Sequence, residues 1–192
     1  MGYLVRSRLA ALAISIAFGM LVAQAMAEAF VVFPKAGRLM SPDGRYEVRD
    51  ADRSAAPTEF VGTFHSLWLI DVATGQSSKL CDYLGLSAVA WSGNDAVVVT
   101  QYVGKRTSRA LVFSIARLEE PVILDQSTLV QMIAPDWRYY LRGNDHIFIE
   151  ASRLENAIFY FRVWGYGQHD PSGFAWKCQY ALTDGKVVCT KR

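Results

Sequence analysis

The fold is easiest to read at residues 41–50, which are Ser41-Pro42-Asp43-Gly44-Arg45-Tyr46-Glu47-Val48-Arg49-Asp50. Proline in second place and glycine in fourth are typical of a tight type I turn, because proline already holds φ at about −65°. Residues 45–49 then alternate in polarity, as a half-exposed strand does. The segment therefore predicts a turn followed by a β-strand.

Similar β-rich runs, separated by turn residues, continue along the chain, and helical periodicity is nearly absent after residue 27. Residues 67–70 and 96–99 are apolar at every position, which is typical of strands covered on both faces and hence of stacked sheets. We therefore predict an all-β fold. The predicted strands are 30–33, 45–50, 65–71, 87–91, 96–102, 109–115, 121–124, 129–133, 138–142, 146–151, 157–164, 174–181 and 186–190.

A weak internal repeat relates three turns, at Ser41, Ser92 and Ala134, which are 51 and 42 residues apart. This spacing is the length of a four-stranded propeller blade. The first unit extends from residue 36 to 80 and the second from residue 88 to 124. The third begins at residue 131, and its third strand is predicted at residues 157–163.

The first unit resembles the repeats of TolB-type and prolyl-oligopeptidase-type β-propellers. It keeps Ser41-Pro42-Asp43-Gly44-Arg45-Tyr46, then Trp68-Leu69-Ile70-Asp71, Gly75 and Lys79-Leu80, with Met40 in place of the usual tryptophan. The second unit keeps Trp91-Ser92, and the third keeps Pro135-Asp136. The resemblance implies about three propeller-blade-like antiparallel sheet units. It implies no peptidase activity, because those enzymes carry their catalytic residues in a separate domain that this chain lacks.

Closed propellers have about four to eight blades, so three units cannot close a ring in the usual way. Three alternatives remain open. The domain is an open array of propeller-like sheets, or it closes differently, or the three units are not true repeats.

The first 27 residues read as an export signal. Arg6 and Arg8 precede an apolar run of about 15 residues, short of the roughly 20 that span a bilayer. Ala25-Met26-Ala27 offers small residues where a signal peptidase cuts. We predict a signal peptide at 1–27 and a single β domain at 28–192, in the periplasm or secreted, with no stable membrane span after cleavage. An uncleaved membrane anchor is the rival interpretation.

Charge argues against two classes of partner. Removing the two arginines of the leader leaves 18 basic residues, equal in number to the 18 acidic ones. A neutral protein has no electrostatic reason to bind nucleic acid or an anionic membrane.

The three cysteines, Cys81, Cys178 and Cys189, would enter an oxidising compartment. Residues 174–181 and 186–190 read as a hairpin whose turn is Leu182-Thr183-Asp184-Gly185. If Ala181 pairs with Lys186, counting outward places Cys178 opposite Cys189, whereas a slip of one residue forbids the bond. We predict the Cys178–Cys189 disulfide, with Cys81 free and buried; three buried thiols are the alternative.

Catalytic chemistry has little support in the sequence. No histidine among His65, His146 and His169 lies near another histidine or a cysteine at metal-ligand spacing. The carboxylate pairs Asp50/Asp52 and Glu119/Glu120 read as solvated turns. We expect no catalytic residues, metal or cofactor.

The segment 164–176 is the best candidate for binding, because it mixes aromatic side chains with glycines and hydrogen-bonding groups. The ordinary alternative is a long hairpin loop whose aromatics fold onto the core. We expect a non-enzymatic binding or interaction module of the cell envelope, whose partner is another envelope protein or a glycan. A small hydrolase or carbohydrate-binding protein using this loop is the alternative function. The candidate binding residues are Trp164, Tyr166, His169, Asp170 and Trp176.

Overall fold

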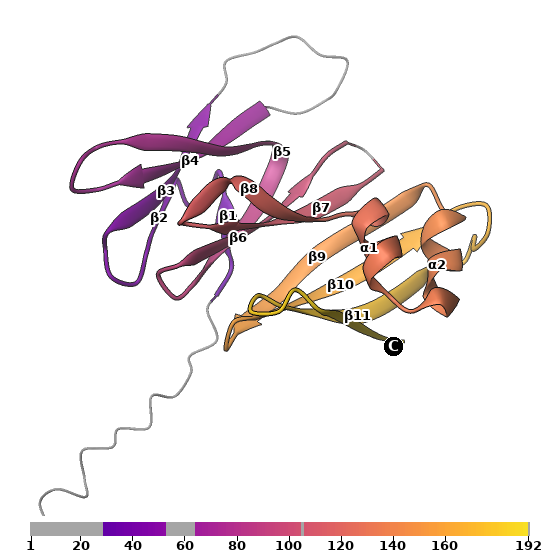
Figure 1. Ribbon diagram of the computed structural model, residues 1–192. Helices are drawn as coiled ribbons and strands as arrows, with labels where there is room; N and C mark the ends of the chain where they lie inside the picture. Colours follow the sequence, from indigo (N-terminus) through magenta and orange to yellow (C-terminus); the bar gives the residue numbers. More distant parts are fainter. Residues whose placement is uncertain (1–28, 53–63, 105, 192) are drawn as a thin grey trace, which may run out of the picture.

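A computed structural model describes residues 29–52, 64–104 and 106–191 (Figure 1). The predicted signal peptide at 1–27 lies outside these residues. The prediction of an all-β fold is confirmed, since 61% of the described residues are in strands and 9% are in helices, and the sheets are antiparallel. The strands are β1 (Val31–Phe33), β2 (Arg38–Met40), β3 (Tyr46–Asp52), β4 (Phe64–Asp71), β5 (Ser77–Ser92), β6 (Ala96–Tyr102), β7 (Ser108–Ser114), β8 (Arg117–Leu124), β9 (His146–Glu155), β10 (Ile158–Tyr166), β11 (Phe174–Ala181) and β12 (Val187–Lys191).

The strands form two sheets. The larger has the order β2-β3-β4-β5-β6-β7-β8, with β1 pairing to β5, and the smaller, which we call the terminal sheet, has the order β12-β11-β10-β9. Strand β5 is 16 residues long and its pairing with β6 shifts register between Leu84 and Ser87, beside Gly85 at φ 70°. Its first half therefore completes a four-stranded unit with β2–β4, and its second half begins another with β6–β8.

Two hydrophobic cores separate three sheet layers. In β6, Val97 and Val99 enter the core shared with β3 and β4, whereas Val98 enters the core shared with the terminal sheet. The prediction that residues 96–99 are covered on both faces is therefore confirmed. In β4, by contrast, Leu67 and Leu69 are buried while Trp68 and Ile70 lie half-buried on the other face. The prediction for residues 67–70 thus holds for one face only.

The turns of the first unit follow from their sequence. The hydroxyl of Ser41 donates to Asp43 Oδ1 at 2.7 Å and accepts from the backbone N–H of Tyr46 at 2.9 Å. Gly44 donates its N–H to the carbonyl of Ser41 at 2.9 Å and has φ 72°, a conformation that glycine adopts without strain. These bonds fix the turn that starts β3.

Two predicted strands, 129–133 and 138–142, are helices: α1 (Gln126–Met132) and α2 (Pro135–Arg142). Asp125 caps α1 by accepting from the N–H of Thr128, whose hydroxyl accepts from the N–H of Asp125. Proline suits the first turn of α2, because its missing N–H would be unpaired there in any case. The strand prediction overlooked this capping chemistry.

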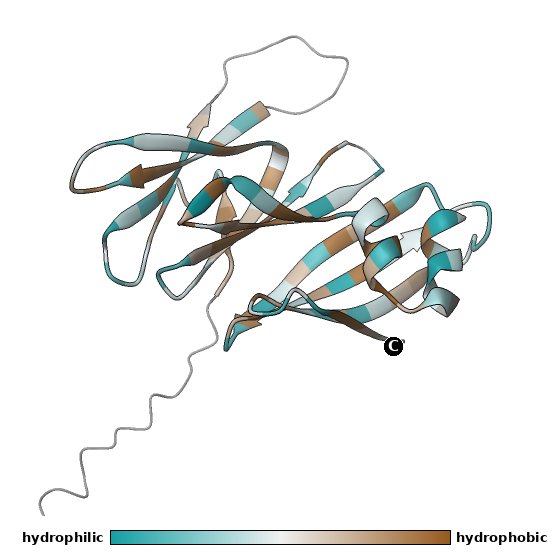
Figure 2. Cartoon of the chain, in the orientation of Figure 1, coloured by the Kyte–Doolittle hydropathy of each residue, from teal (hydrophilic) through white to brown (hydrophobic). Residues whose placement is uncertain are grey.

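The third four-stranded unit therefore begins later in the chain than the residue 131 that the sequence predicted. The terminal sheet begins with β9 at His146, and β10 is its second strand, whereas residues 157–163 were expected to be the third strand of that unit. The larger sheet forms two antiparallel layers, β2–β5 and β5–β8 with β1, and the terminal sheet forms the third, with four antiparallel strands. Hydrophobic and hydrophilic colours alternate along β9 and β10 in Figure 2, as expected of strands with one buried face.

Candidate functional site

The terminal sheet has one buried face and one open face. On the inner face, Phe159, Phe161 and Val163 of β10 are at most 2% exposed and belong to the core that the sheet shares with β5–β8 and the two helices. Because side chains alternate along a strand, Arg162 and Trp164 point to the other side. Their cross-strand neighbours on β9 are Glu150 and Phe148.

A groove of about 550 Å³ crosses this open face. All four strands contribute to it, so the twist of the whole sheet shapes the hollow. We call it the outer groove. Its main side chains are Arg153 of β9, Tyr160 and Arg162 of β10, Lys177 and Gln179 of β11, and Thr190 of β12.

The arginines of the outer groove are held in place by their neighbours. The Arg153 guanidinium lies 3.9 Å from the ring centroid of Tyr160, and its Nε is 3.3 Å from the Glu155 carboxylate. Arg162 Nη1 lies 3.6 Å from Glu150 Oε2, and the guanidinium is 5.7 Å from the Trp164 ring. Stacking and ion pairing together limit the rotamers of these long side chains.

A strip of stacked rings continues from the groove toward the start of β9. Trp164 stacks on Phe148 with centroids 4.3 Å apart, and Tyr166 stacks on His146 at the same distance. Tyr102, from the end of β6, meets Phe148 edge-on at 6.2 Å. Tyr102 and Tyr166 are both more than 40% exposed, so the strip presents aromatic surface at its rim.

The five predicted binding residues occupy three different places. Trp164 and Tyr166 lie on the open face, as part of the aromatic strip. Trp176 is 2% exposed and lies on the inner face, 4.7 Å from the Trp137 ring of α2. Its aromatic ring therefore belongs to the core. For Trp176 the alternative interpretation holds, in which aromatics of segment 164–176 fold onto the core.

His169 and Asp170 lie in the loop between β10 and β11, over the end of α2. The His169 ring stacks on Tyr139 at 5.0 Å, and a Cβ at Gly143 would overlap it, which explains the glycine there. The N–H of Asp170 donates to Asn144 Oδ1 at 3.3 Å. Neither residue lines the outer groove, so the loop and the groove are separate features.

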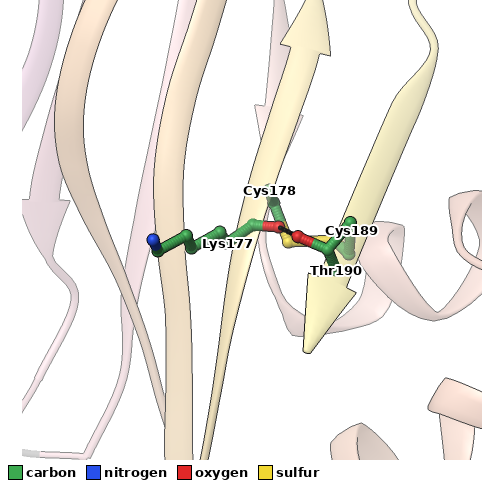
Figure 3. Close-up of a disulfide and its surroundings, with 4 residues drawn as sticks. All are labelled: Lys177, Cys178, Cys189 and Thr190. Carbon is green, nitrogen blue, oxygen red and sulfur yellow. Dashed lines mark hydrogen bonds between the residues drawn. A yellow bond between two sulfur atoms is a disulfide. The ribbon is translucent and has the colours of Figure 1, made fainter. Parts of the chain in front are cut away.

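The predicted disulfide is confirmed. Cys178 of β11 and Cys189 of β12 are paired and bonded, and the N–H of Ala181 donates to the carbonyl of Lys186 at 3.0 Å, which is the predicted register. Figure 3 shows the bond between the two strands, with Lys177 and Thr190 beside it. Cys81 is free and buried, also as predicted, and burial raises the pKa of its thiol to about 12.

A polar cluster lies at the edge of the other core. Asp50 accepts from the Tyr83 hydroxyl at 2.6 Å and lies 3.2 Å from Nδ1 of His65, while the His65 and Tyr83 rings stack at 5.1 Å. His65 is 7% exposed. These bonds satisfy buried polar groups. Asp50 therefore lies in strand β3 with a side chain that is only 11% exposed, and not in the solvated turn that the sequence predicted.

Comparison of the chain with protein-family models, with curated proteins and with solved structures found no match. Within residues 29–52, 64–104 and 106–191, no group of three or more His, Cys, Asp or Glu side chains could hold a metal ion. None of the helices in the described part of the chain is long and apolar enough to cross a membrane.

The sequence analysis missed all six main side chains of the outer groove: Arg153, Tyr160, Arg162, Lys177, Gln179 and Thr190. The alternation of residues 158–164 carried a usable signal, because Tyr160, Arg162 and Trp164 share one face. The binding site was predicted in the glycine-rich segment 164–176 and not in the strand that precedes it.

Proposed function

We propose that the protein is an exported, non-enzymatic interaction module that binds another protein of the cell envelope through the outer groove. The observation that carries this proposal is the composition of the open face. Tyrosine, tryptophan and arginine dominate the energetics of protein interfaces, and here Tyr160, Arg162 and Trp164 are consecutive on one face of β10.

Rigidity supports the same function. Binding costs less entropy when the contact side chains already hold one conformation. Arg153 is fixed against Tyr160, and Arg162 is fixed between Glu150 and Trp164. The disulfide between β11 and β12 holds the other side of the groove.

The charge of the groove favours an acidic partner. Arg153, Arg162 and Lys177 line it, and the carboxylates of Glu150 and Glu155 offset only part of their charge. Electrostatic complementarity then speeds association and selects against basic partners. A protein with exposed carboxylates fits these groups better than a neutral glycan does.

The propeller-like architecture is part of the proposal. Three antiparallel layers of four or five strands lie in succession. Equivalent turns of the first two units are in contact. Asp43 donates its N–H to Asn94 Oδ1 at 3.0 Å, and Trp91 donates to the carbonyl of Leu39 at 3.4 Å. Each pair joins residues 51 or 52 positions apart, close to the spacing between the first two repeat turns. We regard the chain as an open array of TolB-type units.

Export also remains a proposal. A disulfide between two strands is typical of proteins that mature in an oxidising compartment, and residues 1–27 have the composition of a leader.

Site-specific cross-linking tests the function. A photoreactive residue at Gln179, in the groove, should give one defined cross-linked species in cells that express the full chain. The matched control carries the same residue at Glu119, which is exposed on β8, and should not give that species. Arg162→Ala should weaken the cross-link by about tenfold, the effect of removing an interface anchor. Equal cross-linking from both positions, or no effect of Arg162→Ala, would contradict the proposal.

A further inference from the structure

The edge of the terminal sheet at β12 carries a row of outward-facing backbone groups. In an antiparallel pair, residues alternate between close pairs without hydrogen bonds, about 4.5 Å apart at Cα, and wider bonded pairs. Cys178 and Cys189 are 4.1 Å apart at Cα and therefore form a pair without backbone bonds. By the same alternation, Val187 and Lys191 direct their N–H and C=O groups away from β11, as Cys189 does.

The other sheet edges are protected in ways that β12 is not. Edge strands are commonly blunted by shortness, charge, proline or a covering segment. Strands β1 and β2 have three residues each, and β8 carries Glu119, Glu120 and Pro121. The edge of β9 is covered by residues 106–108, which lead into β7: Ile147 donates its N–H to the Arg106 carbonyl at 3.0 Å, and Ile149 donates to the Ser108 hydroxyl.

Strand β12 pairs with β11 alone among the described strands. Its middle residues, Val188, Cys189 and Thr190, include no charge or proline, and its pairing with β11 has no register shift. The disulfide fixes the strand next to the chain end, where fraying is otherwise expected. A regularly paired strand, fixed by a disulfide and with backbone groups that face away from its neighbour, is the template on which peptide recognition by strand addition depends.

Lysines surround this edge. Lys186 precedes β12 with a side chain that is 78% exposed and pairs with the Asp184 carboxylate at 3.0 Å. Lys177 is the cross-strand neighbour of Thr190 on the groove side. Lys191 lies on the inner side, 5.8 Å from the Trp137 ring and 5.5 Å from the Tyr140 ring. An added strand would meet positive charge on both of its faces.

We propose that β12 accepts an extended acidic segment of the partner protein as a fifth, antiparallel strand of the terminal sheet. This inference rests on the proposed function and specifies how the groove is used. Backbone bonds to Val187, Cys189 and Lys191 supply affinity. Carboxylates at alternate positions, near Lys177 on one face and Lys191 on the other, supply selectivity.

A display experiment tests the inference without knowledge of the partner. The purified full chain, with its disulfide formed, selects from a phage-displayed library of random peptides of about eight residues, enough to span β12. Enriched peptides should carry acidic residues at alternate positions. Methylating backbone nitrogens of a synthetic selected peptide should weaken binding at every second residue only, since only those N–H groups face β12.

A pair of protein variants isolates the edge. Lys191→Pro removes an outward-facing N–H donor and places a proline ring against the incoming strand. It should lower the affinity for the selected peptide by about tenfold or more. Lys191→Ala removes the charge but keeps the backbone N–H donor, and should lower the affinity for the peptide by a smaller factor. The peptide methylation series needs no variant, so it decides the question even if Lys191→Pro misfolds.

Several outcomes would overturn the inference: no enriched peptide, methylation effects without a two-residue period, or dimers of the protein that Lys191→Pro dissociates, which would assign the edge to a second copy. The Gln179 cross-link separates the two proposals. Its loss in Arg162→Ala but not in Lys191→Pro would leave the groove proposal intact and reject strand addition. Its persistence in both would reject the groove.

Discussion

Strands β6 and β10 are both rich in apolar residues but differ in their surroundings. Val97, Val98 and Val99 of β6 are all fully buried, because a sheet layer packs against each face. In β10, Phe161 is buried while its neighbour Arg162 is exposed. A strand covered on both faces serves the core at every position, whereas one covered on a single face can use alternate positions for binding. The position of a layer in the array therefore decides whether it can carry a site.

The sharpest test of this difference replaces adjacent residues in each strand. Phe161→Ala should lower the free energy of unfolding by about 3–5 kcal/mol, since it leaves a cavity in the core. Arg162→Ala should cost less than about 1 kcal/mol, because its ion pair is exposed. In β6, Val97→Ala and Val98→Ala should both cost about 1–3 kcal/mol. Urea denaturation measures all four values, and equal costs at Phe161 and Arg162 would show that the open face is covered.

Removing the disulfide should lower stability by an intermediate amount, and the loss should be confined to the terminal sheet. The bridge joins residues 11 apart, and replacing both Cys178 and Cys189 by Ala should cost about 2–3 kcal/mol through the entropy of the unfolded chain. Hydrogen exchange should speed up in β11 and β12 but not in β6. Cys81 is an internal control, because its buried, protonated thiol should resist alkylation until the protein unfolds. Faster exchange throughout β6 would show that the two regions unfold together.

The smallest effect is expected at Asp125, which caps α1 between the two regions. Burial raises the pKa of its carboxyl, but hydrogen bonds from the Thr128 and Ser127 backbone N–H groups and side chains outweigh this and leave the pKa below its ordinary value. The cap therefore stabilises the fold above the ordinary pKa of about 3.9, and this contribution is lost as pH falls through the lowered folded-state value.

Asp125→Ala should cost about 1 kcal/mol near neutral pH, and the difference from the unchanged protein should shrink in acid. Asp125→Asn is the control, because an amide oxygen can still cap the helix but does not titrate. Thermal denaturation as a function of pH measures both variants. If the stability difference between Asp125→Ala and the unchanged protein stayed constant down to the lowest pH, the carboxylate would not be the capping group.

Local chemistry carried the successful predictions. The turn at Ser41–Gly44, the buried run at residues 96–99 and the register of the last hairpin all depend on residues close in sequence. Helices α1 and α2 were missed because their signals, a capping residue at Asp125 and a proline at the start of a turn, are short beside the surrounding β-rich runs. The alternation of residues 158–164 could have placed Tyr160, Arg162 and Trp164 on one face of a strand. It could not show that this face stays open, because that depends on which face of β10 the preceding layer covers.

Strand β5 couples the folding of the first two repeat units, because it belongs to both. Because one unbroken segment of 16 residues belongs to both, neither unit has a complete set of strands without the other. No break in the chain between residues 77 and 92 could release two self-sufficient halves. During synthesis the first unit must wait for β5 to emerge, and the second can then grow directly on a strand that is already in place. We therefore expect the two layers to fold as one cooperative unit, to which the terminal sheet is joined through the helices.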